Sequence, residues 1–237
     1  NRFHAESFRR NFGLLVLLGV SLIGFGCHAT PYQPGQASVG EVVTVPILQL
    51  HPTQAAVGER EVAEKESKDM GRNAVDLQQY IEHKVVPVVI GPGNKLYMTD
   101  HHHTMLALLR SGRTKTCEAK IIADYSNLSP EAFWKKMKQK QWVYLKNAQG
   151  QAITPSQLPS NLNGMANDPY RALAGAVRDL GGFKKSSKPF AEFQWANFFR
   201  SRVKIDPGQA GWAQAVRQAK ALAHSPQARD LPGYVSN

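Results

Sequence analysis

The stretch Lys95–Gly112 restricts the fold most, because it joins a short strand directly to a helix. Its apolar run Leu96–Met98 predicts a strand, Asp100 is a favourable helix N-cap, and the apolar stripe 105–109 predicts a helix that ends at the final glycine. Three consecutive histidines, 101–103, therefore stand where a strand becomes a helix. Free N–H groups and the positive end of the helix dipole favour anions at such a point, so we expect function here.

Adjacent histidines suggest a metal site, but helical geometry argues against it. Neighbouring residues of a helix point about 100° apart, so three successive imidazoles cannot converge on one ion if all are helical. The stretch also lacks the H-x-x-x-H spacing of helical zinc sites. If the first positions keep a loop conformation, Asp100, His101 and His103 could still bind a divalent metal ion, so a metal cofactor stays open.

Phosphate binding suits these residues better, because neutral imidazoles donate hydrogen bonds to phosphate oxygens and one could act as a general acid or base. His102 shares a helical face with the apolar stripe, so we expect it in the core, although it stays in the candidate substrate-binding set. His101 and His103 are the preferred residues for chemistry.

The N-terminal segment has the pattern of an export signal. Arg9 and Arg10 precede an uncharged apolar stretch, 13–26, that is shorter than the roughly 20 residues of a membrane span. Cys27 could be the lipidated first residue of an envelope lipoprotein, or it could belong to an ordinary cleavage site. A buried N-terminal helix is the alternative. We expect residues 1–27 to be a signal and 28–40 a polar tether, which places the protein in the periplasm or envelope.

Charge gives weaker guidance to partners. The formal net charge is +11, which favours nucleic acid, nucleotides or an anionic membrane surface, although such a balance also serves solubility. Membrane attachment would run through Cys27, and the sequence does not indicate an oligomeric state.

The rest of the chain divides into a mixed half and a helical half. The patterns predict strands at 42–48, 85–90, 96–98 and 118–125, a charged helix or ordered loop at 57–68 and a helix at 74–83. Polar residues at 129, 154, 168 and 206 each stand directly before a proline, a pattern that predicts a helix N-cap followed by the first helical residue. Pro189 opens a further helix whose dense aromatic residues predict a core rather than a base-stacking surface.

Five motifs in this order resemble the ParB-like nuclease family of the ParB/sulfiredoxin superfamily. They are Leu50-His-Pro-Thr-Gln54, Val89-Ile-Gly-Pro-Gly93, Asp100-His-His-His-Thr104, Asn167-Asp-Pro-Tyr-Arg171 and the aromatic segment 189–199. The resemblance implies an α+β fold: a ParB/sulfiredoxin-like domain at 41–126 with a small mixed sheet, followed by an α-helical C-terminal region at 127–237.

The resemblance also suggests roles for single residues. The superfamily box runs Gly-x-His-Arg or Gly-x-Arg-Arg and binds nucleotide phosphates; here His103 keeps the His position, His101 replaces Gly and Thr104 replaces the final Arg. Thr104 offers one hydroxyl where arginine would bind phosphate through two N–H groups. Glu61 and Lys65 occupy the place of an acidic catalytic residue or substrate contact in some relatives, unless they lie on a solvated helix face.

In the second half, Arg171 and Glu192 lie within family-like motifs. We expect them to pair across two helices, with a place beside the histidine pocket as the less favoured alternative.

The resulting hypothesis is a nuclease or phosphoryl-transfer protein that acts on nucleic acid or a nucleotide. Its catalytic residues would be Asp100, His101 and His103 with Glu61 as base, and its substrate-binding residues His102, Thr104, Lys65, Arg171 and Glu192. Two alternatives stay open: a non-catalytic exported protein that binds an anion or a partner, and a nucleotide-dependent kinase of small molecules. Export argues against abundant ATP or chromosomal DNA as substrates.

Overall fold

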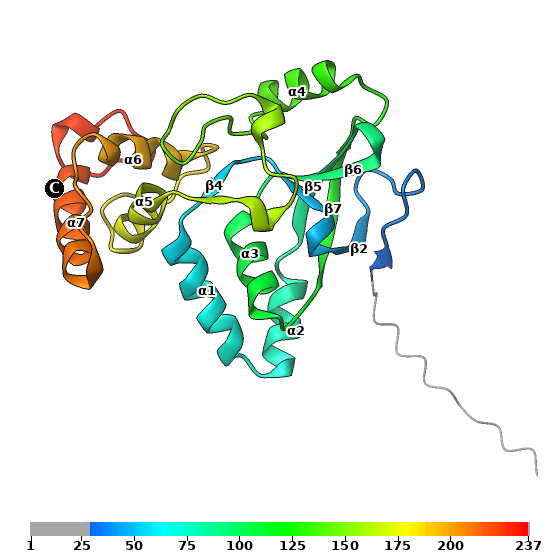
Figure 1. The fold of residues 1–237 in the computed structure, drawn as a ribbon, viewed down its shortest axis with the longest axis horizontal. Helices are drawn as coiled ribbons and strands as arrows, with labels where there is room; N and C mark the ends of the chain where they lie inside the picture. The colour runs from blue at the N-terminus through cyan, green and yellow to red at the C-terminus, as the bar shows by residue number, and fades with distance from the viewer. Residues whose placement is uncertain (1–28, 237) are drawn as a thin grey trace, which may run out of the picture.

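A mixed six-stranded sheet forms the centre of the molecule (Figure 1). The computed structural model describes residues 29–236, so the predicted signal 1–27 with Cys27 lies outside the described residues. The sheet has the order β1-β2-β7-β5-β6-β3. Its strands are β1 (Thr30–Pro31), β2 (Val42–Pro46), β3 (Leu50–Pro52), β5 (Val86–Gly91), β6 (Lys95–Met98) and β7 (Thr116–Asp124).

Parallel and antiparallel pairs alternate across this sheet. β2 with β7 and β5 with β6 are antiparallel, whereas β1 with β2, β5 with β7 and β3 with β6 are parallel. The strands predicted at 85–90 and 96–98 are present and form an antiparallel hairpin, whose turn uses Gly93 and Asn94 with φ of 72° and 57°. The fold is α+β, as the sequence predicts.

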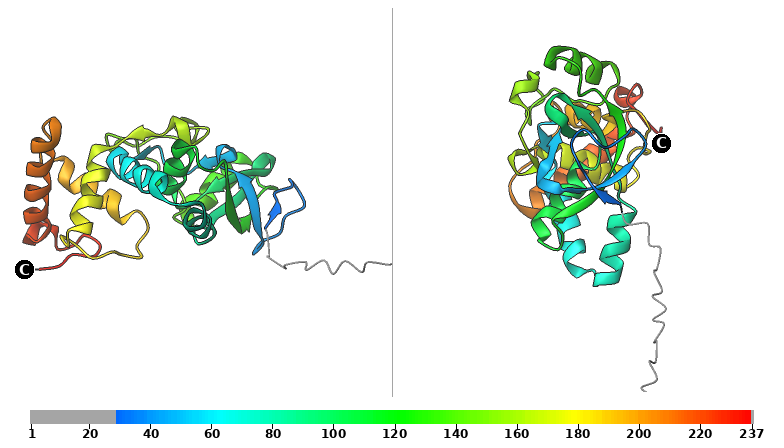
Figure 2. Two further views of the ribbon diagram at one scale, coloured as in Figure 1. Left: turned by 90° about the horizontal axis from the view of Figure 1, so that it is seen from below. Right: turned by 90° about the vertical axis from the view of Figure 1, so that its right-hand side faces the viewer.

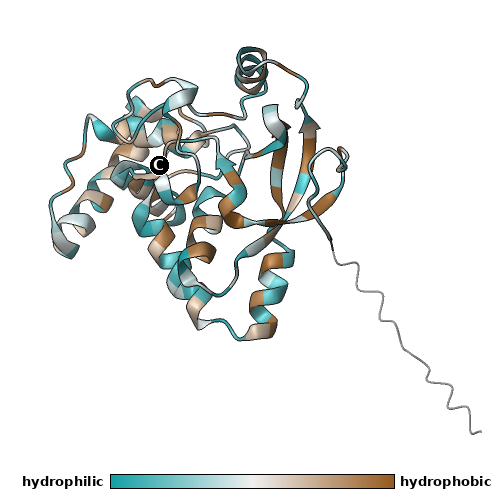
Figure 3. Ribbon diagram, turned by 45° about the vertical axis from the view of Figure 1, so that its right-hand side comes forward, coloured by the Kyte–Doolittle hydropathy of each residue, from teal (hydrophilic) through white to brown (hydrophobic). Residues whose placement is uncertain are grey.

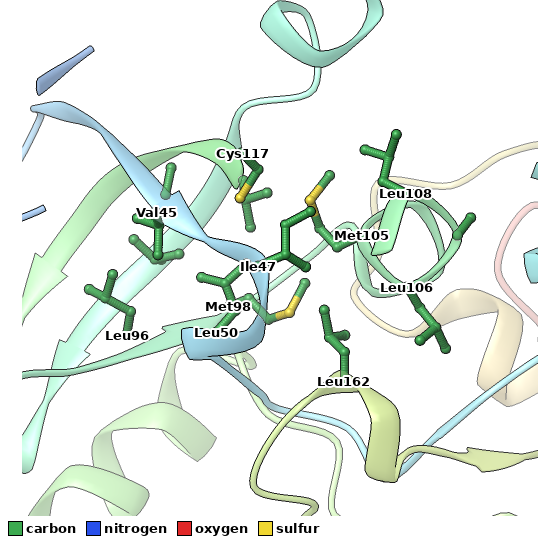
Figure 4. Packing of buried hydrophobic residues seen from close by; sticks show 14 of the residues in the cluster. Val45, Ile47, Leu50, Leu96, Met98, Met105, Leu106, Leu108, Cys117 and Leu162 are labelled. Carbon is green, nitrogen blue, oxygen red and sulfur yellow. The ribbon is translucent and has the colours of Figure 1, made fainter. Parts of the chain in front are cut away.

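Three helices cover one face of the sheet: α1 (Glu59–Gly71), α2 (Ala74–Glu82) and α3 (His102–Ser111). Alternate residues of the strands, such as Leu96 and Met98 of β6, share one core with Met105 and Leu106 of α3 (Figure 4). This period-2 pattern follows from the pleat of a strand. Figure 3 shows apolar and polar residues alternating along the same elements.

The other face of the sheet carries α4 (Pro130–Gln139). Phe133 and Met137 of this helix are fully buried against Val89 and Ala123 of the strands. The apolar contacts of the sheet therefore extend past residue 126 into the segment that follows.

The C-terminal helices form a separate core at one end of the molecule (Figure 2). They are α5 (Pro169–Asp179), α6 (Ala191–Arg200) and α7 (Gly208–Ala223). Trp195 and Phe199 of α6 are fully buried, which confirms that its aromatic residues form a core. A short parallel pair of strands, β4 (Ala56–Val57) and β8 (Ala166–Asn167), joins this end to the sheet region.

Two local expectations differ from the structure. Residues 30–31 of the predicted tether pair with β2, and Tyr32 and Ala37 pack against the main core, because these apolar side chains cover its edge. Of the four predicted helix starts, Ser129 and Asp168 cap α4 and α5 as expected, whereas Thr154 opens only a short 3-10 turn. α7 begins at Gly208, one residue after Pro207.

Across residues 29–236, the structure contains no helix that is both long enough and apolar enough to span a membrane.

Candidate functional site

The mouth of α3 is formed by a residue in a left-handed conformation. His101 is the N-cap of α3, with φ of 66° and ψ of 17°, so the prediction that Asp100 caps the helix is wrong by one residue. The Asp100 carboxylate instead accepts a hydrogen bond from the His101 N–H at 2.6 Å. A left-handed residue other than glycine costs conformational energy, and such residues concentrate at functional sites.

Three backbone N–H groups at this mouth point out of the helix. They belong to His102, His103 and Thr104, the first three helical residues, which have no carbonyl of an earlier turn to bond. The first hydrogen bond of the helix runs from the Met105 N–H to the His101 carbonyl. Among the hydrogen bonds of residues 29–236, none uses those three N–H groups. They can therefore donate to an anion.

His102 and His103 hold a neighbouring loop rather than facing solvent. The Thr53 N–H donates to His102 Nε2 at 3.1 Å, and the Gly58 N–H donates to His103 Nε2 at 2.9 Å. Because Nε2 accepts in both rings, the neutral tautomer carries its proton on Nδ1. The two imidazoles fix the loop 53–58, which contains β4, against the start of α3.

Burial keeps both of these rings neutral. It lowers the pKa of His102 to about 3. It also lowers the pKa of His103 well below the usual range, with a further contribution from the charge of Arg171. Their exposed fractions are 3% and 8%. His102 thus occupies the core position that the sequence predicts, and His103 lies beside it with the same type of contact.

His101 differs from both neighbours because its left-handed backbone takes it off the helical face, and it stays partly exposed. Burial lowers its pKa, the Asp100 carboxylate acts in the opposite direction, and the charges of Lys84, Lys65 and Lys185 lower it further. These lysines come from the segment between α2 and β5, from α1 and from the loop after α5. Positive charge from three parts of the chain therefore reaches the mouth of α3.

We call this arrangement the α3 cradle. It consists of the backbone N–H groups of residues 102–104, the His101 side chain, Lys65, Lys84 and Lys185.

An ion cluster next to the cradle links α1 to α5 and lies against the neutral His103 of α3. Glu61 of α1 lies 3.1 Å from the Arg171 guanidinium, 3.7 Å from the Lys65 ammonium and 3.7 Å from His103 Nε2. The Glu61 and Arg171 side chains are 19% and 9% exposed, so the pair is largely removed from water. Residues 61 and 65 of α1 are thus brought together with the distant residues 103 and 171, and Glu61 does not lie on a fully solvated face.

The family follows from this framework and from comparison with known proteins. The model of the family described as "Putative ParB-like nuclease" matches residues 43–201. The chain belongs to this ParB-like family. Among solved structures, the crystal structure of protein Atu1540 from Agrobacterium tumefaciens is similar, with a TM-score of 0.77 and 36% sequence identity. The match covers 83% of this chain and 97% of that one. No match was found among curated proteins.

Within this ParB-like chain, the predicted pair of Arg171 with Glu192 is not formed. Arg171 pairs with Glu61 and its ring contact is with Phe193, whereas Glu192 pairs with Arg178. The reason is helical geometry, because residues 171 and 178 are two turns apart on α5 and meet different neighbours. Glu192 therefore belongs to the contact between α5 and α6.

No group of three His, Cys, Asp or Glu side chains in the described part of the ParB-like chain is arranged to hold a metal ion. Asp100, His101 and His103 thus do not form a ligand set in this conformation, since His103 Nε2 is used by the Gly58 N–H and the Asp100 carboxylate bonds its own neighbour. Thr104 is 7% exposed, so it is largely removed from solvent.

Sequence reasoning missed Lys84, Lys185 and the loop partners Thr53 and Gly58. The lysines have no motif around them, and only the fold brings them to the cradle. Gly58 can be noticed in the sequence only as a glycine. The structure gives the reason for it, because a side chain there would meet the backbone of Ala172 at 2.6 Å.

A pocket of about 360 Å³ lies apart from the predicted residues, between the loop 147–164 and the β4–β8 pair. Its lining is uncharged and includes Asn147, Gln149, Gln157 and Asn167.

Proposed function

We propose that this ParB-like protein binds a phosphate ester of nucleic acid or of a nucleotide in the α3 cradle and catalyses its hydrolysis or transfer. The observation that carries the proposal is the cradle itself: free N–H groups at a helix mouth, a partly exposed imidazole and lysines from three separate parts of the chain. Donors and positive charge of this kind stabilise phosphate oxygens and the additional charge of a transition state.

His101 is the residue we assign to proton transfer. Its lowered pKa leaves it mostly neutral near pH 7, so it can accept a proton from an attacking water or hydroxyl. In His102 and His103, Nε2 accepts a hydrogen bond from a backbone N–H of the loop 53–58. These two rings therefore position the loop against the mouth of α3. His101 is thus the histidine whose ring can reach a ligand.

Glu61 is a second candidate base. Lys65 and Arg171 contact its two carboxylate oxygens, and a substrate phosphate would compete with the carboxylate for the same cations. In this proposal Glu61 and Arg171 fix the position of Lys65 beside the cradle, and Asp100 orients the His101 backbone.

The test is turnover with a matched histidine control. The wild-type chain is incubated with labelled single- and double-stranded DNA, RNA and nucleotides, with EDTA or with a series of divalent metal ions. We expect His101→Ala to lower the rate by about 100-fold or more, the range typical of a lost general acid or base. His83→Ala, an exposed histidine after α2, should leave the rate unchanged.

The two variants separate the alternatives. Equal rates for wild type and His101→Ala would remove the catalytic role of this residue. Tight calorimetric binding of a nucleotide or phosphate without turnover of any substrate would select a non-catalytic anion-binding protein. Release of ADP or AMP with a screened metabolite would select a kinase.

We also propose that the chain is exported and carries lipid on Cys27. The pattern of residues 1–27 supports this location. Fractionation of a tagged full-length protein tests it, and a Cys27→Ser variant that stays in the membrane fraction would refute the lipid anchor.

A further inference from the structure

A second basic surface lies on the opposite side of the sheet from the cradle. From residue 132 to residue 167 the sequence contains five lysines and no acidic residue, which is an uneven distribution in a chain with 18 acidic residues. Four of these lysines belong to α4 or follow it directly, and Lys135, Lys138 and Lys140 are exposed. Positive charge is therefore concentrated on the exposed face of α4, a helix that lies at the outside of the molecule (Figure 1).

Four half-buried aromatic rings accompany these lysines on the same side of the sheet. Trp134 of α4 packs edge-on against Tyr97 of β6, with ring centroids 5.3 Å apart, and both rings are only half-buried. Just after the C-terminal end of the helix, the Lys140 ammonium lies 6.0 Å from the centre of the Trp142 ring. Trp142 is stacked with Tyr125 at 6.4 Å, and these two are also half-buried.

The neighbouring charges reinforce the positive sign at one end of the surface. His51 contacts Tyr97 at 5.2 Å, and the charge of exposed Lys95 reaches His51. The acidic residue of α4 itself, Glu131, lies in the first turn of the helix, away from the lysines of its last turns. The α4 surface is defined here by Tyr97, Trp134, Lys135, Lys138, Lys140 and Trp142.

We propose that the α4 surface binds single-stranded nucleic acid. Exposed lysines would contact successive phosphates, and the half-buried rings would stack on unpaired bases. This combination of positive charge with aromatic rings is what single-strand binding requires, because every base has a face that can stack. A duplex keeps its bases inside and offers only its phosphates. The surface lies across the sheet from the cradle, so the inference does not depend on catalysis at His101.

Binding is tested by fluorescence anisotropy of a labelled oligothymidylate strand with the full chain. Excess thymidine monophosphate is present to occupy the cradle, and EDTA prevents metal-dependent cleavage. The triple variant Lys135→Gln, Lys138→Gln and Lys140→Gln removes three charges from the α4 surface. Its matched control, Lys68→Gln, Arg217→Gln and Lys220→Gln, removes three charges from exposed positions of α1 and α7.

We expect the α4 variant to bind the strand at least tenfold more weakly. Its slope of log affinity against log salt should be about 2 smaller, since each phosphate contact of a single strand contributes about 0.7. The control should keep the wild-type slope. Equal losses in the two variants would show that only net charge matters, and would overturn the proposal.

Stacking has its own test. Trp142→Leu should weaken binding about fivefold or more, the lower end of the effect of one lost base stack, whereas Trp212→Leu on α7 should not. Thermal unfolding of each variant shows whether it is folded. If a tryptophan variant is not folded, the lysine variant alone tests the proposal. Unlabelled single strand should compete better than duplex DNA, polyglutamate or anionic lipid vesicles. If any of these competes as well as the single strand, the proposal is refuted.

Discussion

Acid should destabilise this protein through the two buried histidines, and His102 allows the size of the effect to be calculated. Its pKa falls from the ordinary 6.5 to about 3 on folding because the ring is buried. The unfolded chain therefore binds a proton between these values and the folded chain does not. Stability is fully present above pH 6.5 and is lost as pH falls toward 3.

The magnitude follows from the difference between the two pKa values. From pH 7 to pH 5 the imidazole of the unfolded chain changes from about a quarter protonated to almost fully protonated, while the folded ring stays neutral. The free energy of unfolding should fall by about 2 kcal/mol from His102 alone. His103 contributes with the same sign, because burial lowers its pKa as well.

Urea denaturation followed by circular dichroism at pH 7 and pH 5 measures this loss. The control is His102→Gln, whose amide oxygen can accept the Thr53 N–H but does not titrate. The variant should lose about 2 kcal/mol less than the wild type between the two pH values. If both proteins show the same dependence of stability on pH, then His102 is not a buried neutral acceptor of the Thr53 N–H at the mouth of α3.

Three further outcomes follow from the same contacts. Gly58→Ala should lower the free energy of unfolding by about 1–3 kcal/mol, because its Cβ would lie 2.6 Å from the Ala172 nitrogen; urea denaturation measures this, and an unchanged midpoint would contradict it. Arg171→Leu should cost a similar amount by leaving Glu61 without its main partner, and adding Glu61→Gln should recover part of the loss in a double-mutant cycle. Burial raises the pKa of Cys117 to about 12, so a thiol reagent at pH 8 should modify this cysteine only after denaturant is added.

Much of the fold could be predicted because local signals and tertiary packing agree. The hairpin of β5 and β6 has a Gly-Pro-Gly-Asn turn between apolar runs, and α4 and α5 have a polar N-cap followed by proline. The α6 aromatic residues were predicted as core because their number exceeds what a surface helix carries. In each case the local pattern required one geometry, and the packing did not oppose it.

The site was harder to predict, because its details depend on contacts between distant residues. The histidine triplet marks the turn from strand to helix, but the sequence does not show that His101 takes the left-handed position or that His103 accepts from Gly58. Both follow from the path of the loop 53–58, which pairs with β8 more than a hundred residues later. The sequence predicts Glu192 as the partner of Arg171, whereas the actual partner, Glu61, lies 110 residues earlier and has no local signal that links it to Arg171.

The C-terminal helices are consequently part of the site rather than an addition to it. Arg171 reaches from α5 to Glu61 of α1, and the Asp168 N–H bonds the Val57 carbonyl at 2.7 Å just before Gly58. Gly58 in turn donates to His103 at the start of α3. A shift of α5 would therefore move the loop, the Glu61–Lys65 pair and the helix mouth together. Since the family model also spans both halves, from residue 43 to residue 201, the sheet without α5 should lack an ordered cradle.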